Sequence, residues 1–526
     1  MKAAGTIGET LVDPITIEVI GNAYTSIVEE MGEILVHASH STNIKERRDC
    51  STALLDPAGE IICQAEHIPM HLGSFLSIVP RILDHYAVSD IAPGDVFIAN
   101  DPYEGGATHL PDIVIVEPVF AEGRLVAWAA NTGHHADFVD RGNAHIYQEG
   151  LRIPPTRYMR AGAAQVDIER LILLNCQVPQ ERRHDLQAQI GANRFATERI
   201  IGLCARYGVE TILAASAALI DYAERRMRMG IAEIPDGEYA FRDVLETAEI
   251  EDILDVSVNI VVSGDEMRFH FESPPQIRAS LNVTYEALLA SVFYAAKTIV
   301  DPEVPSNSGM MRPITVTAPP GTMFNCRHPA AVNGRLQPCQ RIVDLVYGAL
   351  AQAVPEQVVA AGNGACASVT FVGTSPTGEL WVYLEAIGGG SGARATKNGL
   401  DGVHVHMTNT SNLPIEALEA EYPITVERYA FIEGSGGAGR HHGGRGLSRV
   451  FRAEADCRVR VGGSRLRSVP WGLDGGLPGA SGAIIPGAGV ELLNRTSGIL
   501  RAGQTLEVNS PGAGGYGKPE APEANA

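Results

Sequence analysis

Cysteine pairs, long apolar runs and excess positive charge are all missing from this sequence of 526 residues. The eight cysteines are scattered, and no two have the Cys-x-x-Cys spacing of a zinc knuckle or a redox dithiol. Scattered cysteines in a large acidic protein are typical of a reducing compartment, which predicts a cytoplasmic location. No apolar run approaches the ~20 residues of a transmembrane helix, and Met1–Gly5 lack the apolar core of a signal peptide.

Lysine and arginine number 41 against 62 aspartates and glutamates, so the formal net charge is -21. Nucleic acids and anionic membranes both attract proteins with excess Lys and Arg, so this balance argues against either kind of partner. An apolar fraction of 45% and a charged fraction of 20% describe an ordinary globular protein. A chain of this length is expected to form two or three domains.

Two familiar catalytic loops are also absent. The sequence contains no Gly-x-x-x-x-Gly-Lys-Ser/Thr phosphate-binding loop and no Gly-x-Ser-x-Gly nucleophile elbow. Glycine is dense after residue 386, as in Gly388–Gly392 and Gly512–Gly515, and there we expect turns and close backbone contacts. If the reaction needs ATP, we therefore expect the nucleotide on another subunit.

The pattern of apolar residues predicts an α+β fold with helices and mixed sheets. Helical spacing predicts a helix over 14–45 and a strongly helical region over 165–232. Ser51–Leu55 and Glu60–Gln64 flank the tight turn Asp56–Gly59, which predicts a β-hairpin. Further strands are expected at Val96–Asn100, Ile113–Val119 and Leu125–Asn131, and the expected helical core includes Leu171, Leu173, Leu174, Ile190, Ile200, Ile201, Leu203 and Leu213.

The turn Ile234–Gly237 marks the predicted domain boundary. Residues 1–233 would form an N-terminal domain that carries the candidate site, and residues 234–517 a β-rich, glycine-rich C-terminal region. Within the second region we expect strands near 257–262, 268–271 and 380–384, and helices near 283–300 and 338–353. The Pro/Ala/Glu-rich residues 518–526 are predicted to be a disordered tail.

Histidines and carboxylates recur between residues 66 and 137 in short segments rich in glycine and proline. The segments are Glu66–His71, Asn100–Tyr103, Thr108–Asp112 and Gly133–Asp137. Imidazole and carboxylate are ligands that divalent metals prefer, and glycine and proline indicate rigid loops. Three of these segments adjoin the ends of predicted strands, so we expect their side chains to converge.

His109 and Asp112 lie three residues apart on a loop stiffened by Pro111, and His134 arrives from the end of an adjacent strand. Two imidazoles and one carboxylate, completed by Glu66 or by water, suit Zn, Mn or Fe. The alternative is that these side chains only cap turns. Several such segments so close together in the sequence favour a metal site.

Two details limit this metal prediction. Glu66–His71 differs from the zincin motif His-Glu-x-x-His, because Glu66 precedes both histidines and Pro69 disfavours a helix interior. We interpret that segment as a loop. His134 and His135 are adjacent and point to opposite sides of an extended chain, so we expect one to bind the metal and the other to orient it or to contact substrate.

On these segments the chain resembles the hydantoinase B/oxoprolinase family, and the resemblance spans almost the whole chain. The matching segments are Asn43–Arg47, Glu66–Ser74, Asn100–Asp112, Gly133–Asp137, Gln148–Pro155, Asp185–Gln189, Asn307–Gly309, Asn409–Glu416 and Gly436–Arg440. Members of this family are one subunit of ATP-dependent enzymes that open cyclic amides such as hydantoins, 5-oxoproline or lactams. Related subunits carboxylate ketones.

The resemblance implies a divalent metal held by His109, Asp112 and His134, with Glu66 as a candidate fourth ligand. It also implies a hetero-oligomer with a hydantoinase A-like partner, which is similar to actin-like ATPases and binds ATP with Mg. The sequence departs from the family pattern at Ala107, which separates Gly106 from Thr108, and over 138–143, where a glycine- and proline-rich stretch is expected. The second departure borders the candidate site, so it bears on the choice of substrate.

These observations lead to the hypothesis of a catalytic subunit of an ATP-dependent cyclic-amide hydrolase. The partner would phosphorylate the amide oxygen of a small-molecule cyclic amide, and water activated by the metal would open the ring on this chain. His71, His135 and Asp137 would move protons, and Arg440 would hold an anionic group. Two alternatives stay open, namely a ketone carboxylase subunit and a non-catalytic scaffold for the ATPase. The sequence does not identify the substrate.

Overall fold

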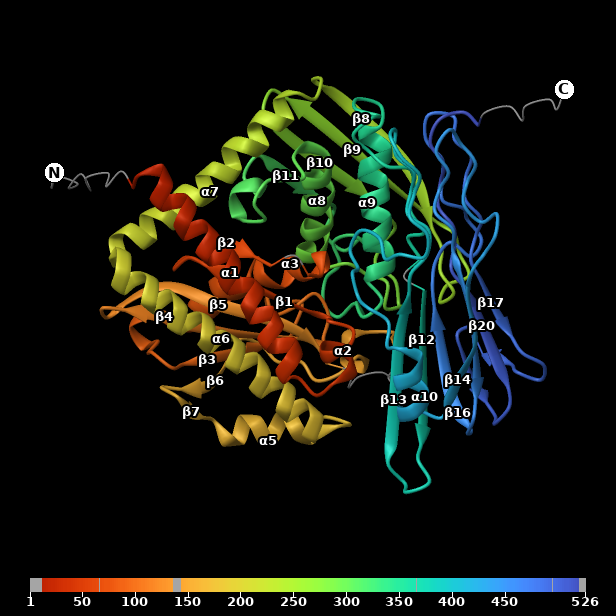
Figure 1. The fold of residues 1–526 in the computed structure, drawn as a ribbon, viewed down its shortest axis with the longest axis horizontal. Coiled ribbons are helices and arrows are strands. Elements are labelled where there is room, and N and C mark those ends of the chain that lie inside the picture. The colour runs from red at the N-terminus through yellow and green to blue at the C-terminus, as the bar shows by residue number, and fades with distance from the viewer. Residues whose placement is uncertain (1–11, 66, 136–142, 366, 494, 520–526) are drawn as a thin grey trace.

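The computed structural model of the chain describes residues 12–65, 67–135, 143–365, 367–493 and 495–519 (Figure 1). Its α-helices are α1 (Pro14–Ala38), α2 (Thr42–Lys45), α3 (Leu72–Phe75), α4 (Ile78–His85), α5 (Val166–Leu174), α6 (Pro179–Tyr207), α7 (Val209–Ala232), α8 (Tyr285–Val300), α9 (Leu336–Leu350) and α10 (Ile415–Glu421). Single 3-10 turns lie at Pro69–His71, Val88–Asp90, Ile146–Gln148 and Ser308–Met311. Helices and separate sheets confirm the α+β class.

The first sheet is antiparallel and has the strand order β2-β1-β5-β4-β3-β6-β7. Its strands are β1 (Cys50–Leu55), β2 (Ile61–Gln64), β3 (Val96–Ala99), β4 (Asp112–Ala121), β5 (Arg124–His134), β6 (Thr156–Arg160) and β7 (Ala163–Ala164). The predicted hairpin and the three predicted strands are confirmed. The register of β4 and β5 pairs Asp112 with His134, so the sheet itself brings two predicted ligands side by side.

Helices cover both faces of this sheet. α1, α6 and α7 form one apolar core against β1, β4 and β5, and α1 and α6 lie across the same face (Figure 1). Buried amides join α6 to the sheet, because Gln189 Nε2 donates to the carbonyl of Ile113 (2.8 Å) and Asn193 Nδ2 to that of Ile115 (3.0 Å). These polar contacts explain why α6 has a weak apolar pattern in the sequence.

The predicted helix over 14–45 is interrupted. α1 ends at Ala38, Ser39 is extended, and α2 begins after Ser41, whose side chain accepts from the backbone N–H of Ile44 (3.4 Å). Serine competes for backbone hydrogen bonds outside the helical conformation, which favours such a break. The break lets α2 and the following residues turn toward the end of β5.

Some predicted core positions are wrong. Leu171, Leu174 and Ile201 are exposed, with 60%, 84% and 41% of their surface accessible. The helix α5 is short and buries only Ile172 and Leu173, so neighbouring leucines face outward. Helical spacing alone does not say which face of a helix meets the core.

A second sheet has the order β11-β10-β9-β8, and α8 and α9 pack against it (Figure 1). Its strands are β8 (Gly237–Leu245), β9 (Leu254–Ser263), β10 (Glu266–Glu272) and β11 (Ile314–Thr317). The apolar core around α8 combines residues from both sides of position 234, including Phe75 and Phe269. The domain division at that position stays a prediction.

The last part of the chain forms two sheets that enclose a separate core, at the right of Figure 1. One has the order β13-β12-β16-β19-β18 and the other β14-β15-β20-β17. Their strands are β12 (Ala367–Thr374), β13 (Leu380–Ile387), β14 (Ile424–Phe431), β15 (Leu447–Ala453), β16 (Cys457–Gly462), β17 (Ala483–Pro486), β18 (Leu492–Leu493), β19 (Ser497–Leu500) and β20 (Thr505–Asn509). A Cβ on Gly392 would lie 1.7 Å from the carbonyl oxygen of Ala360, so the dense glycines do permit close backbone contacts.

Among the described residues no single helix is long and apolar enough to cross a membrane, and α6 and α7 pass that test only as a pair bent by 110°. The described cysteines are all free thiols.

Two buried histidines predict how folding stability depends on pH. Burial lowers the pKa of His67 and of His404 to about 4. In the unfolded chain a histidine has a pKa near ~6.5, so the folded chain binds fewer protons between these values. Their contribution to stability is therefore present above pH ~6.5 and is lost as the pH falls toward 4.

We expect the urea midpoint of the metal-free chain to be lower at pH 5 than at pH 7. His404→Gln should reduce that difference, whereas replacing the exposed His37 by glutamine should leave it unchanged. Equal midpoints at the two pH values in the wild-type chain would contradict this explanation.

Candidate metal centre

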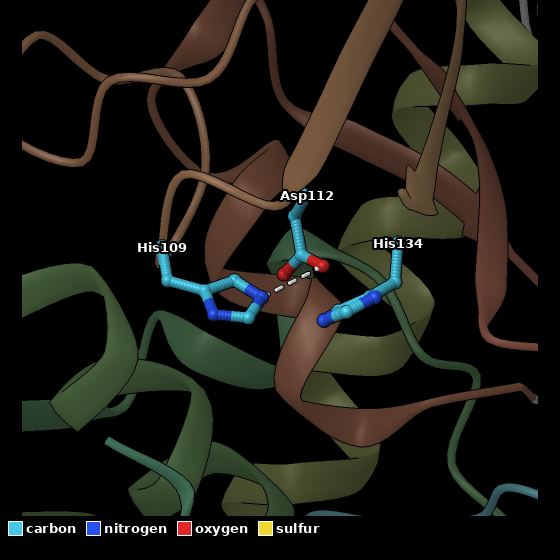
Figure 2. A group of neighbouring side chains, drawn as sticks. All are labelled: His109, Asp112 and His134. Atoms are coloured by element: carbon cyan, nitrogen blue, oxygen red, sulfur yellow. Dashed lines mark ion pairs between the residues drawn. The ribbon is translucent and has the colours of Figure 1, made fainter. Parts of the chain in front are cut away.

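His109, Asp112 and His134 form a cluster at the paired ends of β4 and β5 (Figure 2). One ligand atom from each residue lies within 4.8 Å of the other two. His109 Nε2 is 3.0 Å from Asp112 Oδ1, and His134 points toward them from the neighbouring strand (Figure 2). The structure thus brings together the three residues predicted to be metal ligands.

The His109 ring is held by a contact from outside this sheet. His109 Nδ1 donates to Asn333 Oδ1 (3.0 Å), which leaves Nε2 to face the cluster. Glu149 holds the loop of Asn333 by accepting from the backbone N–H groups of Val332 (3.1 Å) and Asn333 (2.7 Å). This is how proteins orient a histidine that binds a metal through its second nitrogen.

Two atoms of the cluster are buried without a hydrogen-bond partner in the described part of the chain, namely His109 Nε2 and Asp112 Oδ1. Buried polar atoms normally have partners, so two of them facing one another suit a cation between them. Burial lowers the pKa of His109, and it lowers the pKa of His134 to about 4. Both rings are therefore neutral at pH 7, the form in which imidazole binds a metal.

His134 is held by Asn43, which follows the break between α1 and α2. Its Nδ1 lies 2.9 Å from Asn43 Nδ2, and Arg47 Nη1 donates to Asn43 Oδ1 (3.0 Å). A cation on Nε2 of His134 requires the ring proton on Nδ1, and hence an Asn43 amide turned to accept it. Asn43 and Arg47 lie in a segment that carried the family resemblance, but no role was predicted for either residue.

Asp112 is fully buried, and its Oδ2 accepts from Arg335 Nη2 (2.9 Å). Burial opposes ionisation, but the His109 and His71 rings outweigh it and hold the pKa of this carboxyl well below its ordinary value. Arg335 Nε also donates to Thr108 Oγ1 (2.7 Å). Sequence reasoning missed Arg335, although an arginine just before the apolar helix α9 was an available signal.

His71 and His135 lie on different sides of the cluster. His71 Nδ1 is 2.9 Å from Ser51 Oγ, and its Nε2 lies 3.6 Å from Asp49 Oδ1 and 3.7 Å from Asp112 Oδ2. His135 Nε2 instead lies 3.0 Å from Gln189 Oε1 on α6, and burial followed by the nearby Arg182 keeps the pKa of His135 well below its usual value. The adjacent histidines His134 and His135 therefore point apart, as predicted.

Three other predicted site residues do not join this cluster. Glu66 and Asp137 lie outside the described residues. Arg440 is exposed, stacks over the ring of Tyr516 at 6.0 Å, and does not line the cavity beside the cluster.

That cavity has a volume of about 180 Å³ and lies where three parts of the chain meet. His71 and Pro111 come from the N-terminal sheet and its loops, Arg335 from the start of α9, and Thr370 and Arg460 from β12 and β16. The polar floor with apolar and hydroxyl-bearing walls suits a small organic molecule. The site is therefore not built from residues 1–233 alone.

The sequence model described as hydantoinase B/oxoprolinase matches residues 13–519. The chain belongs to this family. Among the relatives of this family member, the uncharacterized protein MJ0963 of Methanocaldococcus jannaschii is 37% identical over 96% of this chain and 91% of its own length. A putative D-/L-hydantoinase subunit from a Pseudomonas strain is 31% identical over 97% and 90%. 5-oxoprolinase 1 of Arabidopsis thaliana is 32% identical over 97% of this chain, which spans only 42% of that relative.

Two solved structures share the fold of this family member. The ATP-dependent caprolactamase from Pseudomonas jessenii superposes with a TM-score of 0.85 at 29% identity, over 97% of this chain and 92% of that one. Acetone carboxylase in its nucleotide-free form superposes with a TM-score of 0.88 over 96% of this chain and 76% of that one. Its sequence identity is 17%, so this second likeness concerns the fold alone.

The departures from the family pattern lie beside the site. Ala107 is buried in the core next to Thr108, the partner of Arg335. Asn143, the last residue of the unusual stretch, donates from Nδ2 to Glu249 Oε2 (3.0 Å), and Glu249 lines the cavity. This family member thus differs from the expected pattern at positions that contact the cavity wall.

Proposed function

We propose that this chain is the ring-opening subunit of an ATP-dependent cyclic-amide hydrolase and that it holds a divalent metal with His109, Asp112 and His134. The observation that carries the proposal is the pair of buried ligand atoms without partners among the described residues, His109 Nε2 and Asp112 Oδ1. The names of the relatives, hydantoinase subunit, 5-oxoprolinase and caprolactamase, support the reaction class. Two imidazoles and one carboxylate suit Zn, Mn or Fe, and Glu66 stays the predicted fourth ligand.

Activation on the partner subunit would precede chemistry on this chain. The partner would transfer a phosphoryl group from ATP, bound with Mg, to the amide oxygen. Water then adds to the activated carbon, the C–N bond breaks as nitrogen takes a proton, and a second water releases phosphate from the acyl phosphate. A divalent ion at the cluster would supply the activation of water at neutral pH.

The chain's own side chains would orient the reactants and move protons. His71 presents Nε2 to the cavity between Asp49 and Asp112, so it is placed to take a proton from water or give one to the leaving nitrogen. His135 has Nε2 occupied by Gln189, so it is better placed to fix the loop. Arg335 keeps Asp112 ionised. The proton role of Asp137 stays a prediction.

Reconstitution with a hydantoinase A-like subunit tests this function. The complex should open hydantoin, 5-oxoproline or caprolactam with ATP cleavage coupled to product. Acid formation from acetone that depends on bicarbonate, with no cyclic amide opened, would replace the proposal with the carboxylase. Turnover of neither class would favour the scaffold. The cytoplasmic location predicted from the cysteines stays a prediction.

The contact between Asn333 and His109 predicts a second effect on metal binding. Asn333→Ala removes the acceptor of His109 Nδ1, so the ring loses its orientation. We expect the affinity for the metal to fall about 10- to 100-fold, as for other residues that hold a ligand in place. Competition with a chelator measures this, and Asn259→Ala, on the distant strand β9, is the control. Unchanged affinity in the Asn333 variant would show that His109 needs no such support.

A further inference from the structure

Three arginines among the described residues line the cavity, and two of them face carboxylates. Arg335 lies 2.9 Å from Asp112, and Arg460 lies 3.8 Å from Glu249. Arg47 is different, because no ion pair joins it to a carboxylate in the described part of the chain. Its guanidinium is the candidate for a ligand that the protein itself does not supply.

Arg47 is only 4% exposed, and its hydrogen bonds go to neutral acceptors. Nη1 donates to Asn43 Oδ1 (3.0 Å) and to the carbonyl of Leu384 (3.1 Å), whereas Nε is buried without a partner among the described residues. Burying a charge without a counter-charge is costly, so proteins rarely retain one without a use. When Asn43 turns its oxygen to His134, Leu384 is the acceptor that stays with Arg47.

The charge balance of the cavity points to the same class of ligand. Its described lining has three guanidinium groups and three carboxylates, Asp49, Asp112 and Glu249, so their formal charges cancel. A divalent ion at the cluster would leave the cavity with two excess positive charges. A negatively charged substrate would neutralise that excess, whereas a neutral lactam would not.

We propose that Arg47 binds an oxyanion carried by the substrate, either a carboxylate on the ring or the phosphate that the partner adds. Asn43 contacts both Arg47 and His134, so this anion would lie next to the proposed metal ligands. The guanidinium geometry matches both kinds of oxyanion. The inference rests on the proposed function and adds to it the substrate's charge. It also moves the anion site from Arg440 to Arg47.

Two cyclic amides that differ by one carboxylate separate the sources. 5-oxoproline carries the carboxylate, and 2-pyrrolidinone is the same ring without it. Arg47→Gln in the reconstituted complex is compared with Arg47→Lys, which keeps the charge, and with Arg48→Gln. Arg48 is the matched control, because it is the next residue but pairs with Glu33 on α1 outside the cavity.

If Arg47 binds the ring carboxylate, Arg47→Gln should raise KM for 5-oxoproline about 10- to 100-fold and leave 2-pyrrolidinone unchanged, as expected for a lost charge-assisted hydrogen bond. If it binds the phosphate, product formation from both rings should fall by a similar factor while the partner still cleaves ATP. Arg47→Lys should recover part of either loss. Wild-type kinetics for both rings in Arg47→Gln, or equal losses in Arg48→Gln, would overturn the proposal.

A binding measurement keeps this inference separate from the reaction class. Calorimetry on the folded full-length chain loaded with metal uses inorganic phosphate, 5-oxoproline and 2-pyrrolidinone as probes, and thermal melts confirm that each variant folds. The wild-type chain should bind at least one of the two anions more tightly than the neutral ring, and Arg47→Gln should lose that preference. If no cyclic amide is turned over but this preference holds, the hydrolase assignment fails and the anion site stands. If the chain binds neither anion, the anion site fails.

Discussion

Replacing Asp112 by asparagine should abolish stoichiometric metal binding and lower ring opening by about 100-fold or more, since even residues that only support a ligand cost 10- to 100-fold. Asparagine keeps the shape of the side chain and removes the charge that a divalent ion needs. ATP binding should survive, because that site is proposed on the partner. Elemental analysis of the variant and turnover of the reconstituted complex measure the two effects.

The structure adds a second consequence for this variant. Asp112 is also the counter-charge of the buried Arg335, and breaking a buried ion pair costs about 3–5 kcal/mol. Thermal melts must therefore accompany the assays. Asp49→Asn, which removes a carboxylate from the same cavity but not from the cluster, should keep its metal. A folded, assembled Asp112 variant with wild-type turnover would make the cluster structural and move the scaffold to first place.

The isolated chain should neither bind ATP tightly nor open a cyclic amide, and adding the partner should restore turnover. The reason is the absence of a phosphate-binding loop from the sequence, together with the naming of the hydantoinase relative as one subunit of its enzyme. Calorimetry with ATP and a product assay on each protein by itself test this.

The control for this experiment is the partner alone, which should bind ATP without forming a ring-opened product. Micromolar affinity for ATP in the isolated chain would contradict the division of labour. So would ring opening by the isolated chain at the rate of the complex.

The sequence was sufficient to find the ligand cluster because its members lie in β4, β5 and the loop between β3 and β4. A short loop, a proline and alternating apolar residues predicted these strands, and antiparallel pairing then places Asp112 against His134. Strand pairing between neighbours in sequence is a local property, so it could be predicted without the rest of the fold.

The surrounding contacts are not local. Arg335 reaches Asp112 across 223 positions, and Asn333 reaches His109 across 224. No periodicity marks such partners, because they depend on how α9 packs against the first sheet. Arg440 illustrates the reverse error, since a suggestive segment with glycine and arginine folds onto Tyr516 outside the cavity.

The break after Ala38 is a similar case. Apolar spacing continued through residue 45, but α1 and α2 are separated by serines, and the change of direction brings Asn43 to His134. A local conformational preference of serine therefore outweighed the helical pattern at the point where the chain approaches the site.

Anomalous diffraction from crystals of the chain grown with Zn or Mn is the sharpest check on the proposed metal site. We expect one strong anomalous peak about 2.0–2.3 Å from ligand atoms of His109, Asp112 and His134. A metal-replete crystal in which those three side chains lie more than about 3 Å from any ion would show that the cluster does not bind the metal.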